Sequence, residues 1–170
     1  MAEINTAFSD IYKIFLSKLT DDMYMELTPQ DTERLLKELF LNSLHWFEFP
    51  RQNIYDYNFE SESYNISLTT EEQNIIATYM VVEWLGQQLA SIENTRMKYS
   101  GTDFKFTSQA NHLAKVQALK KYYEQTGFHL QRLYKRRIAG DDGIMRTTMH
   151  TIMEPYDFAN WTRAGELGGQ

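Results

Sequence analysis

The sequence predicts a mainly α-helical protein: a helical bundle with two long antiparallel helices, two shorter helices, an aromatic-rich loop or small β-hairpin at about 51–68, and an extended C-terminal tail. Two observations lead to this prediction. Apolar residues recur at spacings of three and four in four segments, which is typical of helices with one buried face. The stretch 51–68 and the residues after 137 lack that period. The 170 residues, 42% hydrophobic and 24% charged, have the length and composition of one globular domain.

The two shorter helices are expected within the first 50 residues. The first covers about 4–19. The second opens at Thr28, a good N-cap residue, followed by Pro29 where a missing N–H costs nothing, and it ends near Pro50, which disfavours helical geometry in the residue before it. The residues expected on the buried faces are Ile4, Phe8, Ile11, Phe15 and Leu19 in the first helix, and Leu35, Leu36, Leu39, Phe40 and Leu44 in the second.

Residues 51–68 form the expected loop or hairpin. Aromatic residues stand here among Asn, Asp, Glu and Ser, and Tyr64, Ile66 and Leu68 alternate as in a short strand. Loops longer than about 12 residues tend to be functional or disordered. We therefore expect this segment to take part in binding.

The first long helix is expected to begin after Thr69, which has the spacing of a capping box with Glu72. It continues to about Met97, roughly 40 Å at about 1.5 Å per residue. Its apolar residues are Ile75, Ile76, Tyr79, Met80, Val82, Leu85, Leu89 and Ile92.

The second long helix follows a break at 99–103. Either Thr107 or Ser108 is expected to cap it, and it reaches about Arg137. Gly127 lies in its interior, where glycine costs about 1 kcal/mol relative to alanine, and predicts a kink or a close backbone approach. Because only two shorter helices are available to cover two long ones, we expect apolar surface to remain for other subunits.

The character of the sequence changes after Arg137. A cluster of turn residues at 139–143 is followed by a segment that is too apolar for a solubility arm and too irregular for a core of its own. We therefore divide the chain into a helical domain at 1–137 and an extended C-terminal docking tail at 138–170. The tail residues expected to dock on a neighbour are Met145, Met149, Met153, Phe158 and Trp161.

Motifs for catalysis or for a cofactor are not found. Cysteine is absent, which excludes disulfides, thiolate metal sites and cysteine nucleophiles. The four histidines have no i, i+4 pair, the paired aspartates have no converging ligands, and no glycine-rich phosphate loop or Gly-x-Ser-x-Gly motif occurs. We expect no enzyme activity, no catalytic residue, no metal and no cofactor. No apolar run approaches the length of a membrane span.

Charge is divided unevenly along the chain. Residues 1–100 have a net charge of −9 and residues 101–170 a net charge of +3, which together give the −6 of the whole protein. The basic helix 109–137 has three interpretations: a solvated face, a contact with an acidic protein surface, which the acidic residues 1–100 of a neighbouring copy could supply, or a contact with DNA. Its candidate contact residues are Lys120, Lys121, Arg132, Arg136 and Arg137.

Several blocks of the sequence resemble a known family. They are Asp21–Tyr24, Phe47–Arg51, Leu68–Glu72, Glu83–Leu85, Asp103–Leu113 and Leu133–Arg137. Together they are similar to the head–tail connector proteins (neck adaptor or head completion proteins) of tailed bacteriophages, over about residues 20–137. The tail after Arg137 is not part of the resemblance.

The resemblance implies a structural virion protein. Subunits of this family are helical bundles that assemble, usually as a dodecamer, into a ring between portal and tail, which completes the DNA-filled head and provides the site of tail attachment. The implied partners are further copies of the chain, about twelve in a ring, the portal protein, and the tail or a second neck protein, with possible non-specific contact to genomic DNA in the channel. The implied location is the neck of the virion, after assembly in the host cytoplasm.

On this view the aromatic loop and its base form an interface. Phe47, Phe49 and Arg51 would set how the loop leaves the bundle, and Tyr55, Tyr57 and Phe59 would meet portal or neighbour, since aromatic residues are enriched in interface cores. Packing within the monomer core is the alternative for each of them. The alternative function is a small helical nucleic-acid-binding or regulatory protein that uses the basic helix 109–137.

Overall fold

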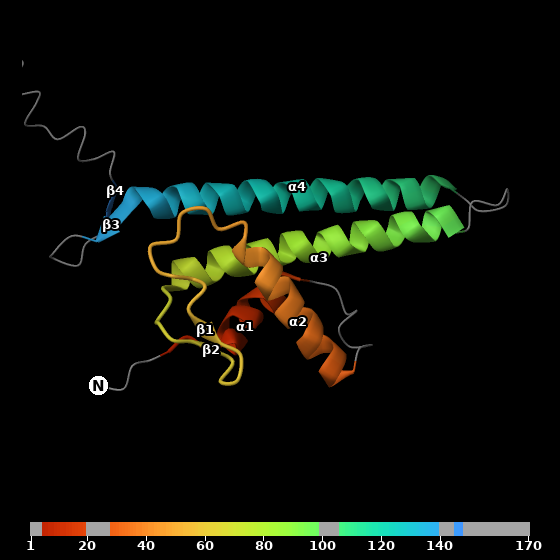
Figure 1. Ribbon diagram of the computed structural model, residues 1–170. Helices are drawn as coiled ribbons and strands as arrows, with labels where there is room; N and C mark the ends of the chain where they lie inside the picture. Colours follow the sequence, from red (N-terminus) through yellow and green to blue (C-terminus); the bar gives the residue numbers. More distant parts are fainter. Residues whose placement is uncertain (1–4, 20–27, 99–105, 140–144, 148–170) are drawn as a thin grey trace, which may run out of the picture. The chain divides into compact units, whose positions relative to one another are not determined.

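The computed structural model describes residues 5–19, 28–98, 106–139 and 145–147 (Figure 1). The fold is mainly α-helical, as the sequence predicts. The chain divides into two compact units, Met1–Gln131 and Arg132–Gln170, with the division inside the last helix. The elements in chain order are α1 (Phe8–Lys18), α2 (Pro29–Leu44), β1 (Tyr57–Asn58), β2 (Ser63–Tyr64), α3 (Thr70–Lys98), α4 (Phe106–Arg136), β3 (Arg137–Ala139) and β4 (Met145–Thr147).

Both predicted helix starts with local capping signals are confirmed. The Thr28 hydroxyl oxygen accepts a hydrogen bond from the Asp31 amide at 3.2 Å, and Pro29 is the first residue of α2. At α3, the Glu72 carboxylate accepts from the Thr69 amide at 2.8 Å, and the Thr69 hydroxyl oxygen accepts from the Glu72 amide at 3.3 Å. This reciprocal pair is a capping box, so two otherwise unpaired amides at the helix start are satisfied.

Three predicted boundaries are wrong. α1 begins at Phe8 rather than near Ile4, because the backbone before it pairs with the hairpin: the Tyr64 amide donates to Thr6 at 2.8 Å. α2 ends at Leu44, since its last turn closes with i to i+3 hydrogen bonds from the Trp46 and Phe47 amides.

α4 begins at Phe106, so Thr107 and Ser108 lie inside its first turn rather than before it. A hydroxyl can serve the free amides of a helix from either place, and sequence alone does not separate the two.

The segment 51–68 contains the small hairpin that was one of its two predicted forms. β1 and β2 are antiparallel, with Tyr57 opposite Tyr64 and Asn58 opposite Ser63. The second strand, β2, covers only Ser63–Tyr64 and is shorter than the strand that the alternation from Tyr64 to Leu68 predicts. The ribbon gains a third partner from the N-terminal segment, where Ala7 forms a bridge with Ser63.

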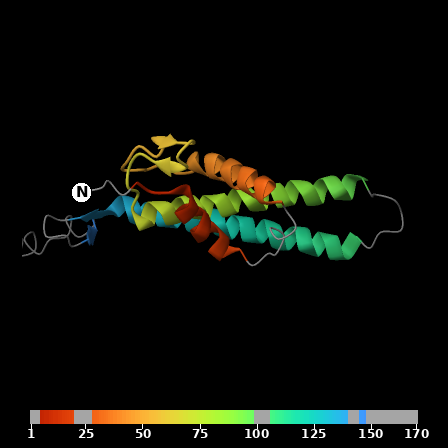
Figure 2. The same cartoon turned by 90° about the horizontal axis from the view of Figure 1, so that it is seen from below.

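The core of the first unit surrounds the N-terminal half of α3. Helices α1 and α2 both pack against α3, and α4 runs antiparallel beside it over the part that belongs to this unit (Figure 1 and Figure 2). Residues 75–82 of α3 are consequently buried on every side of the helix. The buried apolar residues of the other two helices are Phe8, Ile11, Phe15, Leu36, Leu39, Phe40 and Leu44, all of which the spacing predicts. Of the other predicted residues, Leu19 and Leu35 are half-buried and Ile4 lies outside the described ranges.

Aromatic side chains join α1, α2 and the hairpin. The rings of Phe8 and Phe40 lie 4.6 Å apart, and that of Tyr64 lies 5.7 Å from Phe8 and 5.9 Å from Phe40, both in edge-on geometry. Tyr64 is fully buried, and its hydroxyl and that of Tyr12 have no hydrogen-bond partner among the described residues. Burial raises the pKa of Tyr12 to about 12 and the pKa of Tyr64 far above its ordinary value.

Replacing Tyr64 by phenylalanine is expected to raise the free energy of unfolding by about 1 kcal/mol at neutral pH, because a buried hydroxyl without a protein partner is costly and the ring is kept. The gain should grow above about pH 10, the ordinary tyrosine pKa. There the unfolded wild type loses its Tyr64 proton before the folded form does, so wild-type stability falls as the pH rises. Urea denaturation followed by circular dichroism at pH 7 and at pH 10.5 measures both effects. Equal or lower stability of the variant at both pH values would contradict the prediction.

The second unit contains the described part of the predicted tail. β3 and β4 are antiparallel, with Ile138 opposite Arg146 and Ala139 opposite Met145. The sequence did not predict this second hairpin. In the sequence, a stretch of Gly and Asp residues connects the two strands, as is typical of β-hairpins. The connecting residues 140–144 lie outside the described ranges.

Candidate functional site

The aromatic loop exposes two of its predicted contact residues. Tyr55 is 54% exposed and Phe59 is 44% exposed, whereas Tyr57 is half-buried within the aromatic cluster. Phe49 is half-buried and Arg51 is exposed. Phe47 is only 4% exposed. It belongs to the core, so its assignment to an interface is wrong, because a side chain enclosed within its own subunit offers no surface to a partner.

Gln131 of α4 holds the base of this loop. Its side-chain amide nitrogen donates to the Trp46 carbonyl at 2.8 Å and to the Tyr79 hydroxyl, and its amide oxygen accepts from the Glu48 amide at 2.7 Å. Gln131 is 1% exposed. Gln131 was not predicted as a functional residue from the sequence, although its place one turn after Gly127 on a long helix was a signal. The path of the chain out of α2 is therefore set by a helix more than 80 residues away.

The predicted close approach at Gly127 is confirmed. A Cβ atom at this position would lie 2.7 Å from ring carbon Cζ of Tyr79, closer than real side chains approach. The Tyr79 ring is also held in place by the Trp46 indole, on which it stacks with 5.7 Å between ring centres. The Trp46 ring nitrogen donates to the Glu83 carboxylate at 2.6 Å. Gly127 thus lets α4 lie directly against a fixed aromatic pair.

The predicted basic contact residues are not all alike. Lys120 is half-buried, and its ammonium pairs with the Glu124 carboxylate at 2.6 Å, while Lys121 is exposed. Arg132 is exposed, and Arg136 and Arg137 are half-buried; these three belong to the second unit.

The predicted tail residues are mostly beyond the described ranges. Met145 lies in β4, and Met149, Met153, Phe158 and Trp161 fall outside the residues that the structure describes. The expectation that the tail docks on a neighbour therefore stays a prediction.

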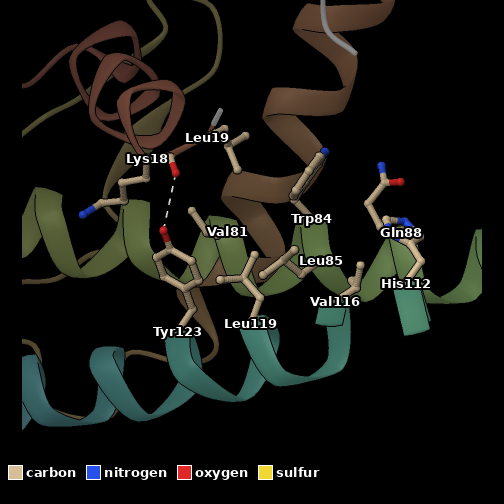
Figure 3. A pocket seen from close by; sticks show the side chains of 10 residues that line it. All are labelled: Lys18, Leu19, Val81, Trp84, Leu85, Gln88, His112, Val116, Leu119 and Tyr123. Atoms are coloured by element: carbon tan, nitrogen blue, oxygen red, sulfur yellow. Dashed lines mark hydrogen bonds between the residues drawn. The ribbon is translucent and has the colours of Figure 1, made fainter. Parts of the chain in front are cut away.

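A pocket of about 500 Å³ lies between the end of α1, the middle of α3 and the first half of α4 (Figure 3). Apolar side chains from both long helices face each other across it, with Val81 and Leu85 of α3 opposite Leu119 of α4. Gln88 and His112 lie at one end, and Lys18 and Tyr123 at the other. The residues that line it are Lys18, Leu19, Val81, Trp84, Leu85, Gln88, His112, Val116, Leu119 and Tyr123. We call it the interhelical pocket.

At its Lys18 end, the interhelical pocket has a positive charge without an ion-pair partner among the described residues. The Tyr123 hydroxyl donates to the Lys18 carbonyl at 3.4 Å, which ties α4 to the end of α1. Lys18 forms no ion pair with any of the described residues, and burial lowers the pKa of its ammonium. An anionic group would therefore be favoured at this end.

An ion-pair cluster of Lys37, Glu33 and Glu62 fixes the hairpin to α2. The Lys37 ammonium lies 2.8 Å from the Glu33 carboxylate and 2.6 Å from that of Glu62, and the hydrogen bonds that it donates to these two carboxylates raise the pKa of Lys37. Glu62 has a φ of 49°, in the left-handed region that side chains rarely adopt. The ion pair and the hydrogen bond from the Phe8 amide to the Glu62 carbonyl, at 2.8 Å, hold this turn in one conformation.

These features favour binding through apolar contacts. Within the described part of the chain, no three histidine, aspartate or glutamate side chains gather as metal ligands. No helix there is long and apolar enough to cross a bilayer. The surface instead offers a pocket lined mainly by apolar side chains and exposed aromatic residues. No protein-family model matches the chain, and searches of curated proteins and of solved structures find no match either.

Proposed function

We propose that the chain is a structural virion protein that forms a ring between the portal and the tail of a tailed bacteriophage. In this role it completes the DNA-filled head and provides the site of tail attachment. The proposal combines the resemblance of the six sequence blocks to head–tail connector proteins with the distribution of exposed apolar side chains over the first unit.

The observation that carries the proposal is that the hairpin loop and α4 each expose more than one large apolar residue, while Leu16 and Trp46 are single exposed residues elsewhere. Tyr55 and Phe59 belong to the loop around the hairpin, and Leu119 and Tyr122, 45% and 60% exposed, belong to α4. Two-fold dimers use one patch that complements itself, whereas two different patches favour head-to-tail contacts, which form a ring when the rotation between successive copies closes and a filament when it does not. Exposed aromatic residues are also what interface cores use.

The alternative, a nucleic-acid-binding protein that uses the basic helix 109–137, has less support. Lys120, one of its central cations, is paired with Glu124 and half-buried, so it adds little to a positive surface. A protein that neutralises many phosphates needs several cations directed to one face.

Native mass spectrometry and negative-stain microscopy test the proposal. The purified chain, alone or mixed with portal rings, is expected to give a closed ring of identical copies. A chain that stays monomeric in both conditions contradicts the proposal. If that monomer binds duplex DNA with an affinity that falls steeply with salt, the nucleic-acid-binding alternative is correct.

Replacing Tyr122 by aspartate is expected to abolish ring formation, because an exposed aromatic side chain at an interface is exchanged for a charge that must lose its water. The matched control is Gln125→Asp, which places the same charge on an exposed position of the same helix. Circular dichroism should show equal helicity for both variants. Rings from the Tyr122 variant would contradict a role for this face of α4.

A further inference from the structure

The interhelical pocket has the size and chemistry to hold protein side chains. From His112 to Tyr123 its α4 wall covers eleven helical steps, about 16 Å at about 1.5 Å per residue. Its walls are mainly apolar, none of the residues that line it is acidic, and the Lys18 ammonium at one end lacks an ion pair within the described ranges. It therefore fits an apolar side chain accompanied by a carboxylate.

We propose that the interhelical pocket of one copy receives the hairpin tip of a neighbouring copy, with Phe59 against the apolar walls and Glu60 beside Lys18. The hairpin tip is residues 58–62. The inference rests on the proposed function, because it names the contact through which successive subunits of the ring would join.

The hairpin tip presents the required side chains in a fixed arrangement. The Phe59 ring is 44% exposed, and its remaining surface is supported by Tyr57 and Phe8, whose ring centres lie 5.0 Å and 6.1 Å away. Glu60 is exposed, and its backbone amide is held by the Asn58 side-chain oxygen at 2.8 Å. Glu62 is already paired with Lys37. Glu60 is thus the tip carboxylate that remains available for a partner.

The geometry of α1 makes this contact intermolecular. The hairpin tip lies beside Phe8 at the first residue of α1, and the interhelical pocket lies beside Lys18 at its last residue. Ten helical steps separate the two sites by about 15 Å, and the ion pair of Glu62 with Lys37 anchors the tip to α2. A tip held in this way cannot enter the pocket of its own chain. As far as the described residues go, each copy keeps one free tip and one open pocket, as a head-to-tail ring requires.

Two complementary variants test the inference. Two variants disable the tip. Phe59→Asp removes the exposed aromatic ring, and Glu60→Lys reverses the charge while it leaves the aromatic cluster intact. Leu119→Glu disables the pocket at a residue that is 45% exposed, so folding is preserved. Each variant alone should stay monomeric, with association weakened about 30-fold or more. An equimolar mixture of a tip variant and the pocket variant should form a 1:1 dimer and nothing larger, because one intact contact remains.

The matched control for the pocket is Gln117→Glu, which adds a carboxylate two residues away on an exposed position that does not line the pocket. It should assemble as the wild type does. If the tip and pocket variants also form rings, the inference is overturned while the proposed function stands. If the wild type never assembles, even with portal rings, the proposed function fails and the inference fails with it.

Cross-linking gives a second, independent readout, because the chain contains no cysteine. The double variant Glu60→Cys, Lys18→Cys places one thiol at the tip and one at the end of the pocket where the inference puts Glu60, within the distance that a disulfide needs. On oxidation it should give a ladder of disulfide-linked oligomers, and each single variant should give at most dimers. A double variant that does not exceed the single variants contradicts the inference.

The stability of the monomer tests whether a segment of the same chain, rather than a neighbouring copy, fills the interhelical pocket. If Leu119→Glu lowers the midpoint of urea unfolding of the monomer, the pocket is filled from within the same chain and the inference is overturned. Asp21→Asn, Asp22→Asn then identifies the source, since these carboxylates follow Lys18 closely in sequence. An unchanged midpoint together with lost assembly supports the neighbouring tip.

Discussion

Replacing Gly127 by alanine is expected to lower the free energy of unfolding by about 2 kcal/mol. The added methyl carbon would lie 2.7, 2.8 and 3.1 Å from three atoms of the Tyr79 side chain. Tyr79 cannot move aside cheaply, because it is 3% exposed, stacks on Trp46 and accepts a hydrogen bond from Gln131. Overpacking of a fixed core costs about 1–3 kcal/mol, and the better helix propensity of alanine offsets only about 1 kcal/mol at most.

Gly86→Ala is the matched control. It is also an interior helix glycine that faces the other long helix, but the nearest atom to an added Cβ is the Lys120 Cε at 3.5 Å, an ordinary contact with a flexible side chain. This variant should be more stable than the wild type by up to about 1 kcal/mol. Urea denaturation of both variants therefore gives shifts of opposite sign. Equal shifts would mean that α4 can slide away from Tyr79.

The parts of the fold that were predictable from sequence are those determined by neighbouring residues. The N-cap at Thr28 and the capping box of Thr69 and Glu72 depend on contacts three residues apart, so they can be read directly from the chain. The buried faces of α1 and α2 follow from helical spacing. The start of α1 was misplaced because the backbone of Thr6 pairs with residues about 60 positions later, and spacing along the helix contains no trace of that pairing.

The candidate site was predictable only in part, for the same physical reason. Exposed Tyr55 and Phe59 follow from an aromatic segment without a helical period. Phe47 has the same sequence signal and is buried, because its side chain is enclosed by the tertiary fold. The interhelical pocket combines side chains from three helices, and its shape depends on how α4 lies on α3. Gly127 indicated a close approach, but nothing in the sequence identified Tyr79 as the partner.

Gln131→Met is expected to lower the free energy of unfolding by about 3 kcal/mol. Methionine nearly keeps the volume of glutamine, so the loss reports the hydrogen bonds rather than a cavity. The variant leaves the Trp46 carbonyl, the Glu48 amide and the Tyr79 hydroxyl without their partner, and each such group costs about 1–3 kcal/mol when it is buried and about 1 kcal/mol when it is partly hydrated. Gln125→Met, on an exposed position of the same helix, should change stability by less than about 0.5 kcal/mol.

A spectroscopic readout separates this role of Gln131 from simple packing. Burial raises the pKa of Tyr79, and the hydrogen bond from Gln131 acts against that rise. Removing the bond while keeping the burial should therefore raise the pKa of Tyr79 further, so its phenol should ionise at higher pH in the methionine variant when followed by ultraviolet absorbance. The same variant frees the chain after Trp46, which leads into the hairpin loop. Ring assembly should then weaken along with stability, whereas Gln125→Met leaves both unchanged. A destabilised variant with an unaltered tyrosine titration would mean that the amide acts by filling space alone.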